Sequence, residues 1–356
     1  MSLPLSHSEY LATHNFQSLD GLRCLSIMAV IAAHCQCFRY GFLGVNLFFA
    51  ISGFLITTLL LRERAKHHDI SLRSFYARRS LRIFPLYYAV LLIYMGSVLF
   101  FKNETLEGRL FWDYLPSYLT YTCNWFLDYE NEQRVVFSLA WSLAAEEQFY
   151  AVWPSVEKHI RGKTLWGVLA GIFIASQAAS LIPIDGDSGI LVLIVRILRK
   201  IPIEILGGVA LAHLLHSSRT YTAFSRLIGG KWTSSVLLVL LILGIFYFPA
   251  VIFLRFWAIA LLMVAFLGSC VVRADHSLSW FLNLRTVKHI GVVSYGIYLM
   301  NQLCKNSALV LFRSLKWPQF NFLVFFVTVV ISVAVASLSY RYYERWFLNL
   351  KTRFSR

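Results

Sequence analysis

The chain has 356 residues, of which 58% are hydrophobic and only 14% are charged. Because ordinary soluble domains carry roughly 25% charged residues, this composition excludes them and indicates a protein that lives in a lipid bilayer. The net charge of +15 then marks the cytoplasmic ends of membrane helices, and nucleic acid is not an expected partner. The six cysteines show no zinc-ligand spacing, so we expect buried structural thiols and no metal site.

Ten apolar stretches approach the ~20 residues that a membrane-spanning helix needs. In chain order they are 20–38, 41–61, 82–101, 139–157, 165–182, 190–215, 233–248, 250–270, 290–312 and 320–343. Pro249 predicts a hairpin or a kinked pair where the seventh stretch meets the eighth. The first stretch lacks the basic leader of a signal peptide, so we expect it to be retained.

The Lys and Arg residues of the connecting loops fall mostly on one side if the N-terminus is cytoplasmic. The positive-inside rule therefore places both termini in the cytoplasm. We find no repeat and no linker composition. The predicted fold is an all-α integral membrane protein of the inner or plasma membrane, with about ten transmembrane helices in a single domain over residues 1–356.

The first stretch carries Arg23 and His34, and an ionisable side chain inside hydrocarbon costs ~2.5–3.5 kcal/mol. Their spacing of eleven residues puts them on one helix face, about 16 Å apart along the axis. Asp20 is within i,i+3 reach of Arg23, so an interfacial anchor pair is one alternative. His34 suits general base catalysis near neutral pH; the alternative is a structural histidine bonded to a neighbouring helix.

The second stretch reads GFLGVNLFFAISGFLIT, residues 41–57. Gly41, Gly44 and Gly53 predict close approach of helix backbones. Asn46 and Ser52 place hydrogen-bonding groups in lipid, where each needs a partner.

The third stretch begins with RRSLRIFPLYY, which places Arg79 and Arg82 on one face at the cytoplasmic boundary. Paired guanidiniums there can bind phosphates in bidentate fashion. Anchoring by the positive-inside rule explains them equally well, and for Arg78 we favour anchoring.

The fourth stretch contains adjacent carboxylates, Glu146 and Glu147, in its first two turns. Adjacent residues diverge by ~100° around a helix, so only one of them faces the bundle centre. A carboxylate near a histidine would orient its ring and stabilise its charged form.

Two later stretches add polar candidates. Arg196, Arg199 and Lys200 form a cationic stripe, which faces either an aqueous outer cavity or the surface of a helix that lies outside the span. Asn301 stands in the middle of SYGIYLMNQ.

Five motifs occur in order along the chain: LDGLR with an Arg-ten-His spacing, GFLGVNLFFAISGFLIT, RRSLRIFPLYY, WSLAAEEQFY and SYGIYL. Together, from about residue 18 to 347, they resemble the acyltransferase-3 family of multi-helix membrane O-acyltransferases. The resemblance implies about ten helices and no permanently bound cofactor. It also implies cytoplasmic acyl-CoA as co-substrate and transfer of an acyl group, commonly acetyl, to a hydroxyl of a glycan or lipid-linked saccharide outside the cytoplasm.

The resemblance also assigns roles by position. Arg23 and His34 match the Arg-ten-His motif, with His34 as the catalytic residue, and Arg79 and Arg82 match the Arg-two-Arg motif at the donor end. Glu146 matches the family's acid.

Two positions depart from the family pattern. A histidine often stands where this chain has Asn301, which questions a second proton-handling role there. Glu344 is not followed by the usual Glu-x-Pro ending. We expect a stand-alone form without a fused soluble domain, which acylates its acceptor directly.

These roles predict a mechanism in which Arg23, Arg79 and Arg82 bind acyl-CoA. His34 deprotonates the acceptor hydroxyl, and Glu146 orients the His34 ring. A covalent acyl-histidine relay is a variant of this mechanism. The expected substrate-binding residues are Arg199 and Asn301. A flippase or transporter of a lipid-linked sugar is the second hypothesis, and a non-catalytic scaffold or sensor the third.

Overall fold

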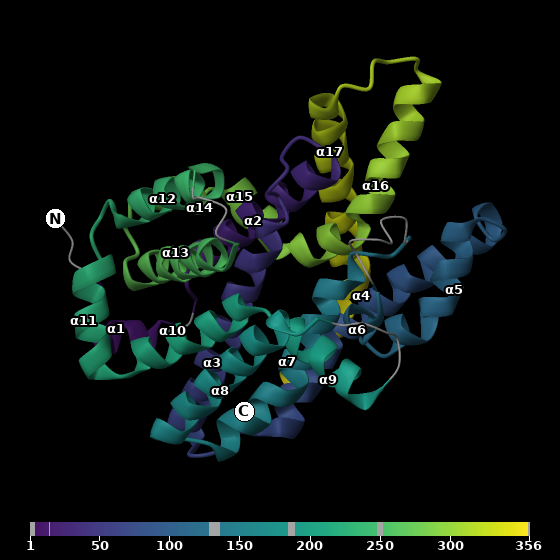
Figure 1. Cartoon of the computed structure of the whole chain (residues 1–356). Helices are drawn as coiled ribbons and strands as arrows, with labels where there is room; N and C mark the ends of the chain where they lie inside the picture. Colours follow the sequence, from purple (N-terminus) through teal and green to yellow (C-terminus); the bar gives the residue numbers. More distant parts are fainter. Residues whose placement is uncertain (1–3, 14, 128–135, 184–188, 248–251, 355–356) are drawn as a thin grey trace. The chain divides into compact units, whose positions relative to one another are not determined.

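The computed structural model describes residues 4–13, 15–127, 136–183, 189–247 and 252–354. Every regular element in these ranges is a helix (Figure 1), as the sequence predicts. The described chain forms two compact units, and each is discontinuous in sequence. Unit 1 comprises Met1–His68 and Ile203–Ser337, and unit 2 comprises Asp69–Pro202 and Leu338–Arg356.

The helices of unit 1 are α1 (His7–Ala12), α2 (Ser18–His34), α3 (Leu43–His67), α10 (Ile203–His216), α11 (Ser218–Ile228), α12 (Thr233–Tyr247), α13 (Ile252–Val272), α14 (Ser279–Leu282), α15 (Arg285–Val292), α16 (Ser294–Ser314) and most of α17 (Asn321–Ser339). Those of unit 2 are α4 (Leu72–Phe101), α5 (Leu106–Leu119), α6 (Cys123–Phe126), α7 (Ala140–His159), α8 (Gly162–Leu181), α9 (Ile190–Arg199), the π-helix η1 (Tyr340–Glu344), α18 (Arg345–Leu350) and the 3-10 helix η2 (Lys351–Phe354).

Five helices within the described ranges are long and apolar enough to cross a membrane, which makes the chain an integral multi-pass membrane protein. They are α3, α4, α8, Arg255–Val272 within α13, and Asn321–Phe354, which continues from α17 to the end of η2. Helices α11 and α12, bent by 73° at their junction, add a sixth if they count as one span. The ten predicted spans are not confirmed by this measure, and the sidedness of the termini stays a prediction.

The predicted stretch 190–215 is divided in the structure. Helix α9 ends at Arg199 and α10 begins at Ile203, because Pro202 has no backbone N–H and disfavours a helical residue before it. The same proline marks the boundary between the two units. Pro249, where the sequence predicts a hairpin or kink, lies outside the described residues.

In unit 1 the predicted close approach at glycines is confirmed. A Cβ atom on Gly41 would lie 2.1 Å from the carbonyl oxygen of Ala29, and one on Gly53 would lie 2.1 Å from that of Ile205. From the other side of the same contact, a Cβ on Gly208 would lie 2.2 Å from the carbonyl oxygen of Ala50. Backbones of α2, α3 and α10 therefore touch where a side chain would hold them apart.

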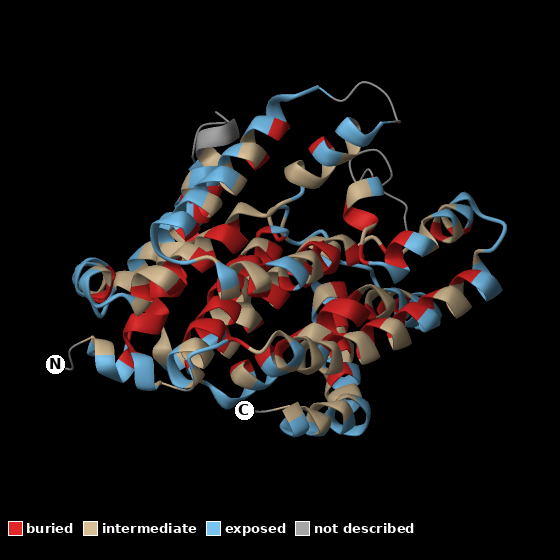
Figure 2. Cartoon of the chain, turned by 90° about the horizontal axis from the view of Figure 1, so that it is seen from below, coloured by how far each residue is buried: buried red, intermediate tan, exposed pale blue. Residues whose placement is uncertain are grey.

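Apolar side chains fill the rest of unit 1. Leu22, Phe54, Leu211 and Phe266 belong to one buried cluster that joins α2, α3, α10 and α13. Helices α12 and α13 pack against each other (Figure 1), and buried residues gather where helices meet (Figure 2). All six cysteines are free thiols, and only Cys37 is exposed, as expected of structural cysteines.

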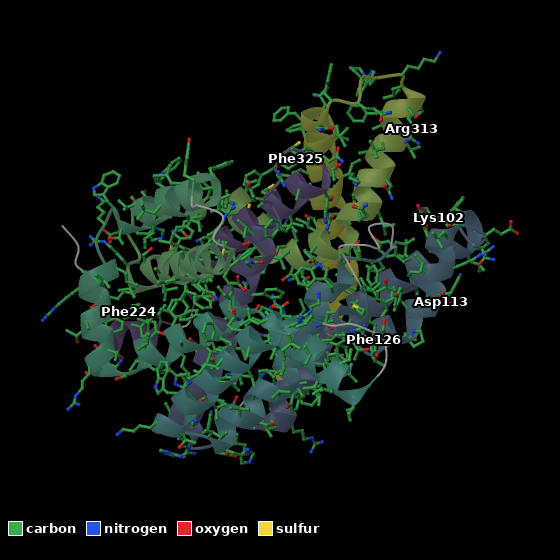
Figure 3. All side chains as sticks on the ribbon, viewed as in Figure 1. Lys102, Asp113, Phe126, Phe224, Arg313 and Phe325 are labelled. Carbon is green, nitrogen blue, oxygen red and sulfur yellow. The ribbon has the colours of Figure 1, made fainter. Side chains whose placement is uncertain are left out.

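Unit 2 is built around aromatic packing on α4. The rings of Tyr87 and Tyr121 stack with centroids 4.3 Å apart. The Gln148 amide of α7 donates to the carbonyl of Tyr121 at 2.7 Å. Beyond Lys102 the chain turns into α5, which carries Asp113 (Figure 3). These contacts hold α4 and α7 in one unit with the short segment α6.

The glycine contact between α3 and α10 predicts a stability difference. Gly208→Ala places a methyl group against the Ala50 carbonyl, so the helices must separate, at a cost of ~1–3 kcal/mol. Unfolding of the purified protein in detergent measures this loss. Gly167→Ala on α8 is the matched control, because a Cβ there meets nothing within 4 Å and alanine favours a helix over glycine by up to ~1 kcal/mol. A Gly208→Ala protein as stable as wild type would contradict the assigned contact.

Candidate functional site

His34 is the last residue of α2, four residues before the predicted end of that stretch. The N–H groups of Cys37 and Phe38 both turn back to the carbonyl of Ala32, and Gln36 takes a left-handed conformation with φ 57°. This tight turn ends the helix directly after the histidine. The His34 side chain is half-buried, so its ring is held by protein and still partly accessible.

The His34 ring is fixed by Asn301 on α16, a residue 267 positions away. His34 Nδ1 lies 2.5 Å from Asn301 Oδ1, and the Asn301 amide nitrogen donates to the carbonyl of Tyr298. Because a carbonyl can only accept, the amide nitrogen must face Tyr298 and the amide oxygen must face His34. An oxygen acceptor requires a proton on Nδ1, so the neutral imidazole keeps the lone pair of Nε2 for chemistry.

A second residue of α16 holds the backbone of the same histidine. Lys305 Nζ donates to the carbonyl of His34 at 3.2 Å. A cation at a helix C-terminus satisfies an unpaired carbonyl and interacts favourably with the helix dipole. Lys305 was not singled out from sequence, although its position one turn after Asn301 in an apolar stretch was a signal.

A buried amide–carboxyl pair lies between α3 and α10. Asn46 Nδ2 donates to Glu204 Oε1 at 2.7 Å, and Glu204 is 7% exposed. The sequence indicated that Asn46 needs a partner but not that Glu204, 158 residues away, supplies it. The pair satisfies two polar groups that would otherwise be costly inside the bundle.

Arg23 and Asp20 form the i,i+3 pair that their spacing predicts, with Arg23 Nη1 2.8 Å from Asp20 Oδ1. Both belong to α2, as does His34. The Arg23 side chain is 19% exposed. One carboxylate therefore balances the arginine charge at this level of the helix.

Unit 2 brings together two other predicted residues, Arg79 and Glu146, through Tyr150. The Arg79 guanidinium lies over the Tyr150 ring, 4.5 Å from its centroid, and the Tyr150 hydroxyl donates to Glu146 Oε1 at 2.6 Å. A cation–π contact stabilises the arginine while leaving its donors directed elsewhere. Tyr150 was not singled out from sequence, and its position four residues after Glu146 was the available signal.

Arg82 lies near the C-terminal segment, where it interacts electrostatically with Glu344 and Lys351. Arg199 instead joins two helices. Its Nε donates to the carbonyl of Ala179 at 2.8 Å, and its Nη2 donates to that of Ile182, so it caps the end of α8. Substrate binding by Arg199 stays a prediction.

The predicted residues thus fall into two groups. His34, Asn301, Arg23 and the newly found Lys305 belong to unit 1. Arg79, Arg82 and Glu146 belong to unit 2, with the newly found Tyr150. The described partner of the His34 ring is Asn301, and orientation of this ring by Glu146 stays a prediction.

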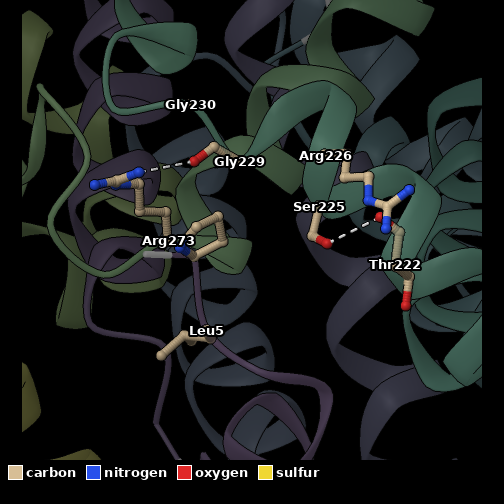
Figure 4. Close-up of a pocket in the computed structure, with 8 residues that line it drawn as sticks. Leu5, Thr222, Ser225, Arg226, Gly229, Gly230 and Arg273 are labelled. Atoms are coloured by element: carbon tan, nitrogen blue, oxygen red, sulfur yellow. Dashed lines mark hydrogen bonds between the residues drawn. The ribbon is translucent and has the colours of Figure 1, made fainter. Parts of the chain in front are cut away.

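A cavity of about 450 Å³ lies elsewhere in unit 1, lined by residues that include Leu5, Thr222, Arg226 and Arg273. The Arg273 guanidinium donates to the carbonyl of Gly229 at 3.1 Å (Figure 4) and pairs with Asp275. The positive charge of Arg273 is therefore balanced by Asp275 within the fold.

Comparison with known proteins identifies the relatives of the chain. A family model described as an acyltransferase domain, that of the acyltransferase-3 family, matches residues 16–341. The peptidoglycan O-acetyltransferase OatA of Listeria monocytogenes is 31% identical over 307 residues, which cover 79% of this chain and 48% of OatA. YrhL of Bacillus subtilis, named provisionally as a peptidoglycan O-acetyltransferase, is 26% identical over 367 residues, 92% of this chain and 54% of YrhL.

The chain spans about half the length of these curated relatives. No solved structure matches it significantly.

Proposed function

Because the chain belongs to the acyltransferase-3 family, we propose that it is a membrane O-acetyltransferase that transfers an acetyl group from cytoplasmic acetyl-CoA to a hydroxyl of a glycan. The similarity to OatA and YrhL, which are named as peptidoglycan O-acetyltransferases, supports peptidoglycan as the acceptor. The observation that carries the proposal is the half-buried His34 ring, whose Nδ1 proton is committed to Asn301. The opposite nitrogen is thereby left basic.

In the proposed reaction His34 Nε2 takes the proton of the acceptor hydroxyl as its oxygen attacks the thioester carbonyl carbon. The new C–O bond forms, the C–S bond breaks, and the thiolate of CoA leaves and takes up the proton. General base catalysis of this kind contributes typically 10²–10⁴-fold to the rate. In the relay variant Nε2 attacks the thioester carbonyl carbon, the C–S bond breaks and the thiolate of CoA leaves. The acceptor oxygen then takes the acetyl group from the ring, and the proton of its hydroxyl neutralises the thiolate.

Asn301 serves as a positioning residue in this proposal. As a neutral acceptor it fixes the tautomer and orientation of the ring without adding a charge that would favour the protonated form. Lys305 fixes the backbone of the same residue. Both hold the base in place before substrate arrives, which lowers the cost of aligning it for reaction.

The phosphates of the donor are assigned to arginines. Arg79 and Arg82 supply guanidiniums suited to phosphate, and Arg23 is proposed to line the donor path, about 16 Å from His34 along α2. Glu146, bonded to Tyr150, is proposed to hold the ring on which Arg79 stacks. The carboxylate therefore acts at the donor end.

Replacing the base tests the reaction. His34→Ala is expected to lower acetyl transfer at least 10²-fold, because it removes the group proposed to take the proton. The assay follows label from [¹⁴C]acetyl-CoA to soluble muropeptides with protein in lipid nanodiscs. His159→Ala is the matched control, because His159 is exposed at the end of α7 and its ring contacts the carbonyl of Ser155 on its own helix. Near-wild-type transfer by a folded His34→Ala protein would remove the mechanism.

Replacing Asn301 separates orientation from charge. Asn301→Leu removes the acceptor and is expected to lower kcat about tenfold, the equivalent of one hydrogen bond of ~1.5 kcal/mol. Asn301→Asp keeps an acceptor and adds a negative charge that stabilises the imidazolium. The acid limb of its kcat profile is therefore expected to move to higher pH. Identical pH profiles for wild type and Asn301→Asp would show that the ring contact is absent in the working enzyme.

The donor contact predicts a change in KM. Arg82→Ala is expected to raise the apparent KM for acetyl-CoA by tenfold or more, since a charge-assisted contact is worth ~1.5–3 kcal/mol. Arg73→Ala, on the same helix but exposed near its start, is the control and should leave KM unchanged. An unchanged KM in Arg82→Ala would retire the donor assignment for this residue.

A further inference from the structure

The C-terminal segment of the chain packs on the arginine-rich start of α4. Arg78 Nη1 donates to the carbonyl of Phe354 at 2.8 Å, and the Tyr343 hydroxyl donates to the carbonyl of Pro85 at 3.1 Å. Tyr343 lies just before α18, and Phe354 is the last residue of η2. The segment between them is thereby held along α4, and all of it belongs to unit 2.

Lys351 begins η2 within this held segment. In a 3-10 helix residues three apart are eclipsed, so Lys351 stands on the same side of η2 as Phe354, whose carbonyl meets Arg78. On α4 the arginines at 78 and 82 are four residues apart and those at 79 and 82 are three apart, so they share one stripe. Lys351 is within electrostatic reach of all three arginines and is half-buried.

The charge around Lys351 is unbalanced. Among the described residues, the charged groups that act on it are the three arginines, and each repels it. Two nearby carboxylates interact electrostatically with the arginines: Glu344 attracts Arg82, and Glu147 attracts Arg79. A half-buried ammonium facing guanidiniums is unfavourable in the absence of an anion.

We infer that Lys351 and the α4 arginines form one composite site for a polyphosphate anion, the nucleotide head of the donor. The inference rests on the proposed function and extends the donor site to the C-terminal segment. Arginine forks suit the planar, bidentate part of phosphate recognition, and lysine adds a compact point charge. The phosphate of an anionic lipid has the same chemistry, so the experiment must separate the two sources.

The experiment compares a donor that has the nucleotide phosphates with one that lacks them. In phosphatidylcholine nanodiscs, Lys351→Met is expected to raise the KM for acetyl-CoA about tenfold with little change in kcat. Its KM for S-acetylpantetheine should equal that of wild type, because this donor has no phosphate. Lys351→Arg should restore KM to within about threefold. Arg353→Met, which removes an exposed cation two residues away, is the matched control and should behave as wild type.

Folding is monitored in parallel. Lys351→Met removes repulsion, so its thermal stability without donor should equal or exceed that of wild type, while the stabilisation produced by added CoA should shrink. An unchanged KM for acetyl-CoA would overturn the inference. So would an equal rise in KM for both donors, which would indicate a structural role. A defect that appears only in nanodiscs containing phosphatidylglycerol would assign the site to lipid and would also overturn it.

A direct binding measurement keeps the inference separate from the proposed function. If wild-type protein transfers no acetyl group from acetyl-CoA, the proposed function fails. Binding of adenosine 3′,5′-bisphosphate to wild type and to Lys351→Met in phosphatidylcholine nanodiscs then still tests whether Lys351 belongs to an anion-binding site. About tenfold weaker binding by the variant supports the composite site, and equal binding overturns it.

Discussion

The hydrogen bond between the His34 ring and Asn301 is the interaction on which the proposed chemistry of this chain depends. Its direction is set by the backbone of α16, because the Asn301 amide nitrogen is already committed to the carbonyl of Tyr298. That commitment turns the amide oxygen toward His34 and so selects the tautomer. A carboxylate in the same place would orient the ring equally well but would favour its charged form. The amide fixes the tautomer that leaves the lone pair of Nε2 unused, without adding a negative charge.

This bond can be maintained only if the end of α2 is fixed in space. The glycine contacts provide that constraint, because Gly41 and Gly44 let the start of α3 and the turn before it lie directly on the backbone of α2. Further along α3, the same kind of close contact joins α3 to α10, at Gly53 of α3 and Gly208 of α10. Close backbone approach gives many small attractive contacts and leaves little room for sliding. Lys305 then holds the final carbonyl of α2.

The cations of the chain divide into those used by the fold and those assigned to a ligand. Arg199 caps α8, and Arg62 donates to the carbonyl of Tyr10 at 3.0 Å, so these two stabilise helix ends and the N-terminal segment. Arg79 is different, because its guanidinium stacks on an aromatic face as well as interacting with Glu147, and we propose that its N–H donors bind a planar anion. The arginines on α4 and Lys351 belong to unit 2, whereas His34, the proposed base, belongs to unit 1.

Sequence alone determined the membrane character, the family and the shared face of Arg23 and His34, because composition and helical periodicity are local properties. It also predicted the close contacts at Gly41 and Gly53. Tertiary structure decided what the sequence left open. Asn301 is hydrogen-bonded to His34 although the two residues are 267 positions apart in the sequence. Glu204 accepts a hydrogen bond from Asn46, 158 positions away. Such partners depend on which helices pack together and on how each is rotated, and the pattern of one helix contains neither.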